Sequence, residues 1–95
     1  MRLTQAQHER ILQAAHQNFG DDANVWLFGS RVDDTRRGGD IDLYVETTQA
    51  STLLSALRCK IALEESLDLP IDLVVKEPGK NKPIYQIARK QGIRL

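Results

Sequence analysis

The chain has 95 residues, which is enough for one small domain and too few for two. Hydrophobic residues make up 41% and charged residues 27%, a globular balance that excludes a disordered or fibrous chain. Thirteen Lys and Arg against thirteen Asp and Glu give zero formal net charge, so we expect no direct nucleic-acid binding and no membrane binding through bulk charge.

Targeting and redox signals are sparse. No apolar run reaches the roughly 18 residues that a membrane span needs, and the N-terminal sequence MRLTQAQHER is too polar for a signal peptide. The single cysteine, Cys59, excludes an intramolecular disulfide and a zinc site made of several cysteines. We therefore expect a single domain over residues 1–95 that works in the reducing cytoplasm.

The first half of the chain is predicted to form a helix followed by two strands. Thr4 and Gln7 match a capping box, after which apolar residues recur at helical spacing, so the helix is expected over 4–19. The apolar run NVWLF predicts a buried strand over 24–28 that ends in a tight turn. A polar loop separates it from DIDLYV at 40–45, where polar and apolar residues alternate as in a second strand.

The second half is predicted to form a long helix over about 48–67, a third strand, IDLVV, over 71–75 and a closing helix over about 82–91. The link between the first two strands is only about ten residues, which is short for a parallel crossover, so this pair is expected to be antiparallel or mixed. The order α-β-β-α-β-α predicts an α/β (α+β) fold with a small mixed sheet flanked by helices.

The long helix carries two apolar stripes on roughly opposite sides. The main stripe, expected to face the core, consists of Ala50, Leu53, Leu54, Leu57 and Ile61. The second stripe consists of Ala56, Cys59, Leu63 and Leu67. Two interpretations of the second stripe stay open: a wide buried face against the sheet, and an interface with a partner protein.

Three aspartates lie in strands that otherwise look buried. Asp40 and Asp42 are two residues apart, so both side chains point to the same face of an extended strand. Carboxylates are costly to bury unless they bind a cation, and Mg²⁺ takes oxygen ligands that substrate phosphates can complete. If the third strand lies beside the second, Asp72 can complete the cluster. The alternative is that Asp40 caps a turn and that the other two are ordinary strand-edge carboxylates.

A phosphate-binding turn is predicted directly after the first strand. Gly29-Ser30 would present backbone N–H groups and a hydroxyl to an anion, and Arg31 adds a planar donor for phosphate oxygens. The alternative is a simple turn with a solvated arginine. The P-loop and G-x-G-x-x-G patterns are absent, whereas a phosphate cradle followed by paired carboxylates is what phosphoryl or nucleotidyl transfer requires.

Taken together, these motifs resemble a known signature. The segment FGSRVDDTRRGGDIDLYV, residues 28–45, resembles that of the minimal nucleotidyltransferases of the DNA polymerase beta superfamily, in which Gly-Ser, a spacer and Asp-x-Asp follow one another. The resemblance covers about residues 10–75 in the order and type of elements, and implies a nucleotidyltransferase-like fold. The matching residues are Gly29, Ser30, Asp40, Asp42 and, as the third carboxylate, Asp72.

The resemblance implies magnesium-dependent transfer of AMP from ATP to a hydroxyl. Asp40 and Asp42 would hold two Mg²⁺ ions, while Asp72 would help to bind the second ion and would accept the proton of the hydroxyl. Gly39 departs from the family pattern, since many relatives carry serine or threonine there, and this weakens one possible phosphate contact. The nucleotide-binding residues implied are Gly29, Ser30, Arg31 and Gly39.

The acceptor is expected to come from another molecule, because larger relatives bind it with a second domain that this chain is too short to contain. Minimal members of the family are typically antitoxins of helical HEPN-domain RNase toxins, and the family's activity is AMP transfer to a toxin tyrosine. The resemblance therefore implies a hetero-oligomer with such a toxin. The alternatives are a catalytically weak antitoxin that acts by binding alone, and transfer to a small molecule or nucleic acid.

Overall fold

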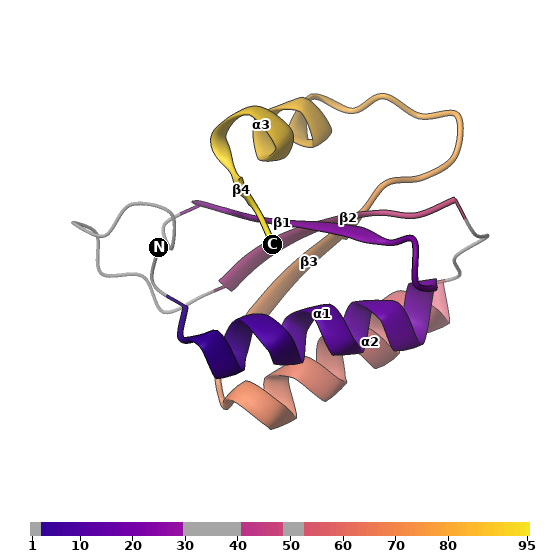
Figure 1. Ribbon diagram of the computed structural model, residues 1–95. Helices are drawn as coiled ribbons and strands as arrows, with labels where there is room; N and C mark the ends of the chain where they lie inside the picture. The colour runs from indigo at the N-terminus through magenta and orange to yellow at the C-terminus, as the bar shows by residue number, and fades with distance from the viewer. Residues whose placement is uncertain (1–2, 30–40, 49–52) are drawn as a thin grey trace.

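In the computed structural model of the protein, residues 3–29, 41–48 and 53–95 are described. All six helices and strands that the sequence predicts are present, and a short fourth strand follows them (Figure 1). In chain order the elements are α1 (Gln5–Phe19), β1 (Asn24–Phe28), β2 (Ile41–Glu46), α2 (Leu53–Leu67), β3 (Ile71–Val75), α3 (Pro83–Gln91) and β4 (Ile93–Arg94).

The four strands form one mixed sheet in the order β3-β2-β1-β4. β1 pairs antiparallel with β2, which confirms the expectation drawn from the short link between them. β2 and β3 run parallel, and α2 forms the crossover that parallel neighbours need. The third strand therefore lies beside the second, the condition under which Asp72 can approach the first two aspartates.

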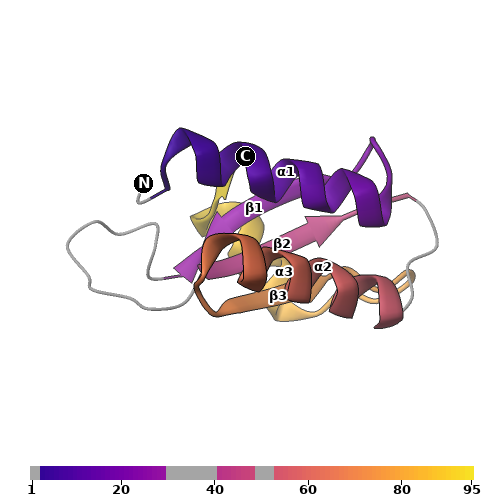
Figure 2. The same ribbon diagram turned by 90° about the horizontal axis from the view of Figure 1, so that it is seen from below.

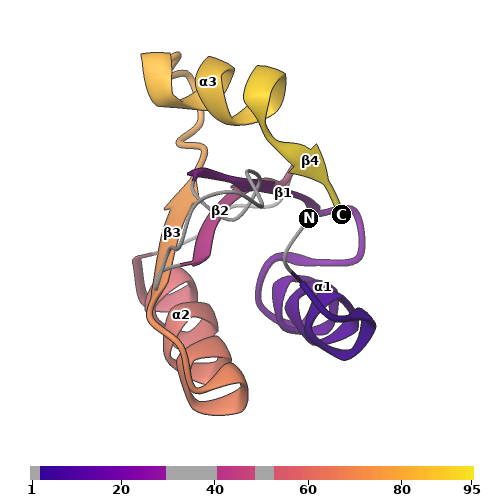
Figure 3. The same cartoon turned by 90° about the vertical axis from the view of Figure 1, so that its left-hand side faces the viewer.

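The helices cover both faces of the sheet, α1 and α2 on one face and α3 on the other (Figures 1 and 3). Successive side chains of β2 point to opposite faces of the sheet. Ile41, Leu43 and Val45 pack in the cluster beneath α1 and α2, whereas Tyr44 packs beneath α3. The expected fold class, a small mixed sheet flanked by helices, is confirmed.

α1 begins with the capping box that the sequence predicts. The Thr4 hydroxyl accepts a hydrogen bond from the Gln7 backbone N–H at 3.1 Å, and the Gln7 side chain accepts one from the Thr4 N–H at 3.0 Å. Seen from below, α1 and α2 lie side by side across the sheet (Figure 2), and the guanidinium of Arg10 donates to the Ser66 hydroxyl at 3.0 and 3.1 Å. These contacts join the two helices into one layer.

The inner face of α2 differs from the expectation. The stripe expected to face the core faces outward, and the core is contacted by the second stripe, with Cys59 and Leu63 fully buried and Ala56 and Leu67 packed against them. Hydrophobic periodicity cannot choose between two apolar stripes on one helix. The smaller side chains Ala56 and Cys59 allow the helix to approach its neighbours closely, which favours this orientation.

The other face of α2 is therefore an exposed apolar surface, which we call the outer α2 stripe. Ala50, the remaining member of the predicted core stripe, lies outside the described residues. The outer α2 stripe consists of Leu53 (78% exposed), Leu54 (55%), Leu57 (45%) and Ile61 (52%).

Aromatic rings fill the space between the sheet and α3. The rings of Tyr44 and Tyr85 stack at 5.4 Å between centroids, and Trp26 packs beside Tyr44 at 5.5 Å. The Tyr44 hydroxyl donates to a Glu46 carboxylate oxygen at 2.7 Å. Burial and then this hydrogen bond raise the pKa of the Tyr44 phenol.

β4 was not expected from the sequence and fastens the end of α3 to the sheet. Gly92 passes so close to β1 that a Cβ built on it would lie 2.8 Å from the Leu27 carbonyl oxygen and 3.3 Å from the Phe28 Cβ. The Leu95 N–H then donates to the Val25 carbonyl at 2.9 Å. A two-residue strand carries too little pattern to be recognised in a sequence.

Candidate active site

Two of the three predicted carboxylates lie side by side. Asp42 on β2 and Asp72 on β3 are partners in the parallel register, and neighbouring strands lie about 4.8 Å apart. Both residues share the sheet face of Tyr44, two positions further along β2, and this is the face that α3 partly covers. Asp42 is half-buried and Asp72 is exposed, so the pair is open to solvent on the β3 side.

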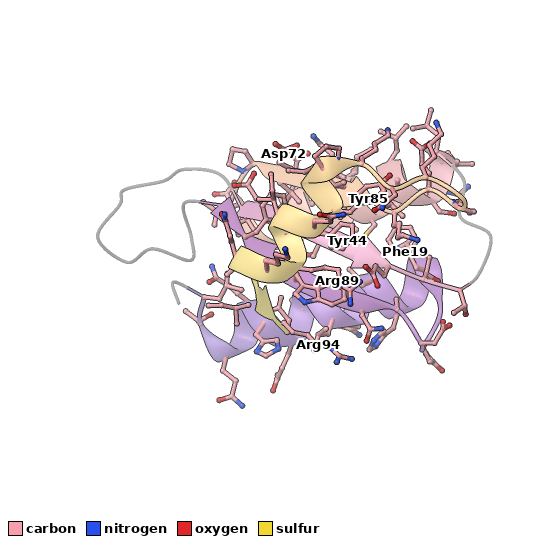
Figure 4. The ribbon with its side chains drawn as sticks, turned by 90° about the horizontal axis from the view of Figure 1, so that it is seen from above. Phe19, Tyr44, Asp72, Tyr85, Arg89 and Arg94 are labelled. Carbon is pink, nitrogen blue, oxygen red and sulfur yellow. The ribbon has the colours of Figure 1, made fainter. Side chains whose placement is uncertain are left out.

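Figure 4 looks onto this face. Tyr44 lies under α3, which carries Tyr85, whereas Asp72 lies toward the β3 edge of the sheet and Arg94 lies at the opposite, β4 side. Arg89 and Arg94 hold their guanidinium groups 5.7 and 5.9 Å from the centre of the Trp26 ring. Arg89 also approaches Glu46 at 3.6 Å. These cations are thus engaged with Trp26 and Glu46, on the part of the face away from Asp72.

The predicted turn begins directly against the Asp42 carboxylate. Phe28, the last residue of β1, is the register partner of Asp42, and Gly29 follows it with a φ of +79°. A Cβ built on Gly29 would overlap the Asp42 Oδ2 and would lie 2.9 Å from its Cγ. Glycine is therefore required at this position for two reasons: the positive φ, and the space that the Asp42 carboxylate occupies. Gly29 and the carboxylate of Asp42 therefore lie in direct contact.

The other predicted site residues, Ser30, Arg31, Gly39 and Asp40, lie outside the described residues, and so do their expected contacts. The structure thus brings together Gly29, Asp42 and Asp72. Within residues 3–29, 41–48 and 53–95, no three His, Cys, Asp or Glu side chains gather as a metal ion would need. The expected third carboxylate of the cluster, Asp40, is not among these residues.

The chemistry of the donors fits Mg²⁺. Two carboxylates on neighbouring strands provide hard oxygen ligands, and the exposure of Asp72 leaves room for waters and phosphate oxygens. A thiol or imidazole would favour a softer metal, but the buried thiol of Cys59 lies on the other side of the sheet, in the cluster beneath α1 and α2. The site therefore suits a magnesium-bound phosphate substrate.

One concavity of the described residues is separate from this site. An open depression of about 250 Å³ is lined by residues at the opposite end of β2, including Glu46, Thr47 and Thr48, together with Lys76. Here the Thr47 hydroxyl donates to the Phe19 carbonyl at 2.7 Å, and Thr48 donates to the Asp22 carboxylate. These bonds fix the end of β2 against the end of α1, so we assign the depression a structural role.

Comparison with known protein families identifies the family to which this chain belongs. The family model of the nucleotidyltransferase domain matches residues 8–95, which include the Gly29 turn, Asp42 and Asp72. The chain belongs to the nucleotidyltransferase domain family. The family expected from the Gly-Ser and Asp-x-Asp signature is therefore confirmed. No curated protein sequence matches the chain significantly.

Solved structures of similar fold support the assignment of this nucleotidyltransferase domain. A protein described as a candidate minimal nucleotidyltransferase is 29% identical, with 95% of this chain and 90% of that chain covered and a TM-score of 0.74. A complex of a tri-AMPylated HEPN toxin from Shewanella oneidensis with its MNT antitoxin matches at 22% identity, with 97% and 71% covered and a TM-score of 0.75.

A further similar structure is a toxin–antitoxin complex with AMP-PNP. It is 23% identical, with 90% of this chain and 69% of that chain covered, and its TM-score is 0.76. These likenesses confirm the nucleotidyltransferase-like fold of the domain. The helices of the domain, over its described residues, are all too short or too polar to cross a membrane.

Proposed function

We propose that residues 1–95 form a single minimal nucleotidyltransferase domain that acts as a cytoplasmic antitoxin. Its reaction is the transfer of AMP from ATP to a hydroxyl, most simply that of a tyrosine, on a helical HEPN-domain toxin. The observation that carries the proposal is the in-register pair of Asp42 and Asp72 beside the Gly29 turn, in a chain of this family. This arrangement suits nucleotidyl transfer, because it places carboxylates next to a phosphate-binding turn.

The similar structures support the choice of partner and substrate. One complex contains a tri-AMPylated HEPN toxin and another contains AMP-PNP. A third, of a MntA and HepT pair, carries two Asp-to-Glu substitutions two residues apart, which is the spacing of Asp40 and Asp42 in this chain. A fourth carries a Tyr-to-Ala substitution. We carry these features over to this chain as part of the proposal.

In the proposed reaction the acceptor oxygen attacks the α-phosphorus of ATP. A new P–O bond forms, the bond from the α-phosphorus to the oxygen that bridges to the β-phosphate breaks, and pyrophosphate leaves. Asp72 accepts the proton of the hydroxyl, a role for which its exposed position beside β2 leaves an approach open to the acceptor. The backbone and hydroxyl of Gly29-Ser30 hold the β- and γ-phosphates, and Arg31 binds the leaving pyrophosphate.

Asp40, Asp42 and Asp72 are the residues that would hold Mg²⁺, with two ions in the complete site. Bound there, the metal would neutralise the charge that develops on the triphosphate. Gly29 keeps the turn close to Asp42, and Gly39 allows the nucleotide to approach the backbone before the carboxylates.

The direct test uses the purified chain, ATP labelled in its α-phosphate, Mg²⁺ and a HEPN-domain toxin from the same organism. We expect the label to appear on the toxin, to be absent when the metal is chelated, and to be absent with Asp42→Asn. Loss of toxin RNase activity should follow the label. A wild-type chain that never labels the toxin under these conditions would exclude the proposed reaction.

Neutralisation by binding alone is the second candidate, and the outer α2 stripe favours it, because this exposed apolar surface could hold a partner without any chemistry. The double variant Asp40→Ala/Asp42→Ala separates the two functions. If it still neutralises the toxin with no label transferred, occlusion is sufficient. Transfer to a small molecule or nucleic acid would instead appear as labelled product in the absence of the toxin.

A further inference from the structure

The exposed large apolar side chains of the described residues are concentrated on one helix. Four of the five lie on α2, in the outer α2 stripe, and the fifth is Ile87 on α3. Their spacing, with Leu53, Leu57 and Ile61 four residues apart, places them on one face. Because the opposite face of α2 is already buried in the core, the helix is apolar on both sides, which is typical of helices that are covered on both sides.

Two cations border the middle of the outer α2 stripe. At 3.6 residues per turn, Arg58 lies on one flank of Leu57 and Lys60 on the other. Neither cation forms an ion pair with another side chain in the described ranges. Glu64 and Glu65 lie on the same side of α2, beyond Ile61, so the stripe has cations beside its middle and carboxylates at its C-terminal end. The complement to the middle of this surface is an apolar stripe flanked by carboxylates, which is the pattern of an amphipathic helix with Asp or Glu beside its apolar face.

A second copy of this chain is a poor complement. A two-fold axis centred on Leu57 would superimpose the two apolar stripes, but it would also place each Arg58 on the same flank as the Arg58 of the other copy, and likewise each Lys60. Like charges facing each other across an apolar contact disfavour the pairing. Shifting the helices far enough to bring Arg58 near Glu65 takes the leucines out of register. The charge pattern therefore favours a different protein.

We infer that the outer α2 stripe is the docking surface for an amphipathic helix of the HEPN-domain partner, with carboxylates bordering its apolar stripe. The identity of the partner rests on the proposed function. The stripe belongs to the α1 and α2 layer, whereas Asp42 and Asp72 share the sheet face covered by α3 (Figures 3 and 4). Docking on α2 therefore holds the partner while leaving the carboxylates open, so binding and transfer depend on separate residues.

The test measures the affinity of the HEPN-domain toxin used in the transfer assay for three variants of the full chain. Leu57→Glu puts a charge into the stripe and should weaken binding by about 30-fold or more. Arg58→Glu/Lys60→Glu should weaken binding and reduce its dependence on salt. Ile87→Glu is the matched control, since Ile87 is 44% exposed on α3, and it should bind like the wild type. Thermal unfolding confirms that each variant is folded.

The kinetics of AMP transfer provide a second, independent test of the docking surface. For Leu57→Glu we expect KM for the toxin to rise with binding while kcat at saturating toxin stays unchanged, because the carboxylates are untouched. Wild-type affinity in Leu57→Glu would overturn the inference, and so would a dimer of this chain that Leu57→Glu dissociates. A toxin that binds through the stripe and is never labelled would exclude the proposed reaction but support the docking surface. If the toxin is labelled but binds Leu57→Glu with wild-type affinity, the proposed reaction is supported and the docking surface is excluded.

Discussion

The carboxylate of Asp42 occupies the space that a side chain on Gly29 would fill. Gly29 has a φ of +79°, and a Cβ there would lie 3.2 Å from the Asp42 Cβ and closer still to its carboxylate. The glycine of the predicted phosphate-binding turn is thus tied to the carboxylate of the next strand. A change at Gly29 is therefore also a change at Asp42.

Gly29→Ala should damage the site more than the fold. The added methyl group displaces the Asp42 carboxylate and strains the backbone, so we expect a loss of about 1–3 kcal/mol in unfolding free energy and roughly 100-fold or more in AMP transfer. Gly79→Ala is the matched control, because Gly79 has a φ of +76° with nothing within 4 Å of its Cβ. It should cost about 1–2 kcal/mol and leave transfer unchanged. Equal rates of AMP transfer by Gly29→Ala and Gly79→Ala would contradict the close contact between Gly29 and the Asp42 carboxylate.

Asp72→Asn should slow AMP transfer strongly without unfolding the chain. Asp72 is exposed, so its replacement should change the unfolding free energy by no more than about 0.5 kcal/mol. As the proposed proton acceptor, it should reduce the rate of transfer about 10²–10⁴-fold. Asp21→Asn, an exposed aspartate between α1 and β1, should be fully active. Wild-type rates for Asp72→Asn would remove this residue from the mechanism.

Tyr44→Phe should test the polar contact beneath α3. Tyr44 is fully buried, and its hydroxyl is bonded to Glu46 at 2.7 Å, so loss of the bond should cost about 1–2 kcal/mol in urea unfolding. Tyr85→Phe should cost less, about 0.5–1 kcal/mol, since its oxygen accepts from the backbone N–H of the exposed Glu77 at 3.1 Å. If Tyr85→Phe lost more unfolding free energy than Tyr44→Phe, Glu46 would not be holding the Tyr44 hydroxyl.

Cys59 should make stability fall in alkali. Burial raises the pKa of its thiol from 9.0 to about 11, so the folded state retains a proton that the unfolded chain loses. This contribution is complete below pH 9 and is lost as pH rises through 11, with a slope of up to about 1.4 kcal/mol per pH unit.

The comparison for this prediction is Cys59→Ala, which has no thiol to titrate. Between pH 9 and 10, urea unfolding should show a shallower decline in stability for Cys59→Ala than for the wild type, because tyrosine ionisation affects both proteins equally. The substitution also removes buried volume, which lowers stability equally at every pH and does not change the slope. Identical slopes would mean that the thiol is not protected by burial.

Much of the fold followed from local signals. The capping box of Thr4 and Gln7, the apolar strands and the short link between β1 and β2 each predicted a feature that is present. The orientation of α2 was not predictable in this way, since both of its stripes are apolar and the choice depends on how closely the helix can pack. β4 depends on the close passage of Gly92 by β1, a tertiary contact that no local pattern records.

The site was predictable to a similar degree. The adjacency of Asp42 and Asp72 followed once an aspartate in an apolar strand was taken as a sign of a neighbouring carboxylate, and the parallel pairing of β2 and β3 provides it. The contact of Gly29 with Asp42 depends on the register of β1 against β2, which the sequence leaves open. The structure gives the positions of Gly29, Asp42 and Asp72, whereas the roles of all the predicted site residues, Ser30, Arg31, Gly39 and Asp40 included, stay predictions.

The parallel pairing of β2 and β3 also sets when the site can exist. Asp42 is synthesised with the β1 and β2 hairpin, but Asp72 is synthesised only after the whole of α2. The two carboxylates become neighbours only when α2 has folded and β3 has paired with β2. A nascent chain that ends within α2 would carry the predicted phosphate-binding turn and half of the carboxylate pair. Catalytic competence is therefore a late event in synthesis, acquired together with the completed sheet.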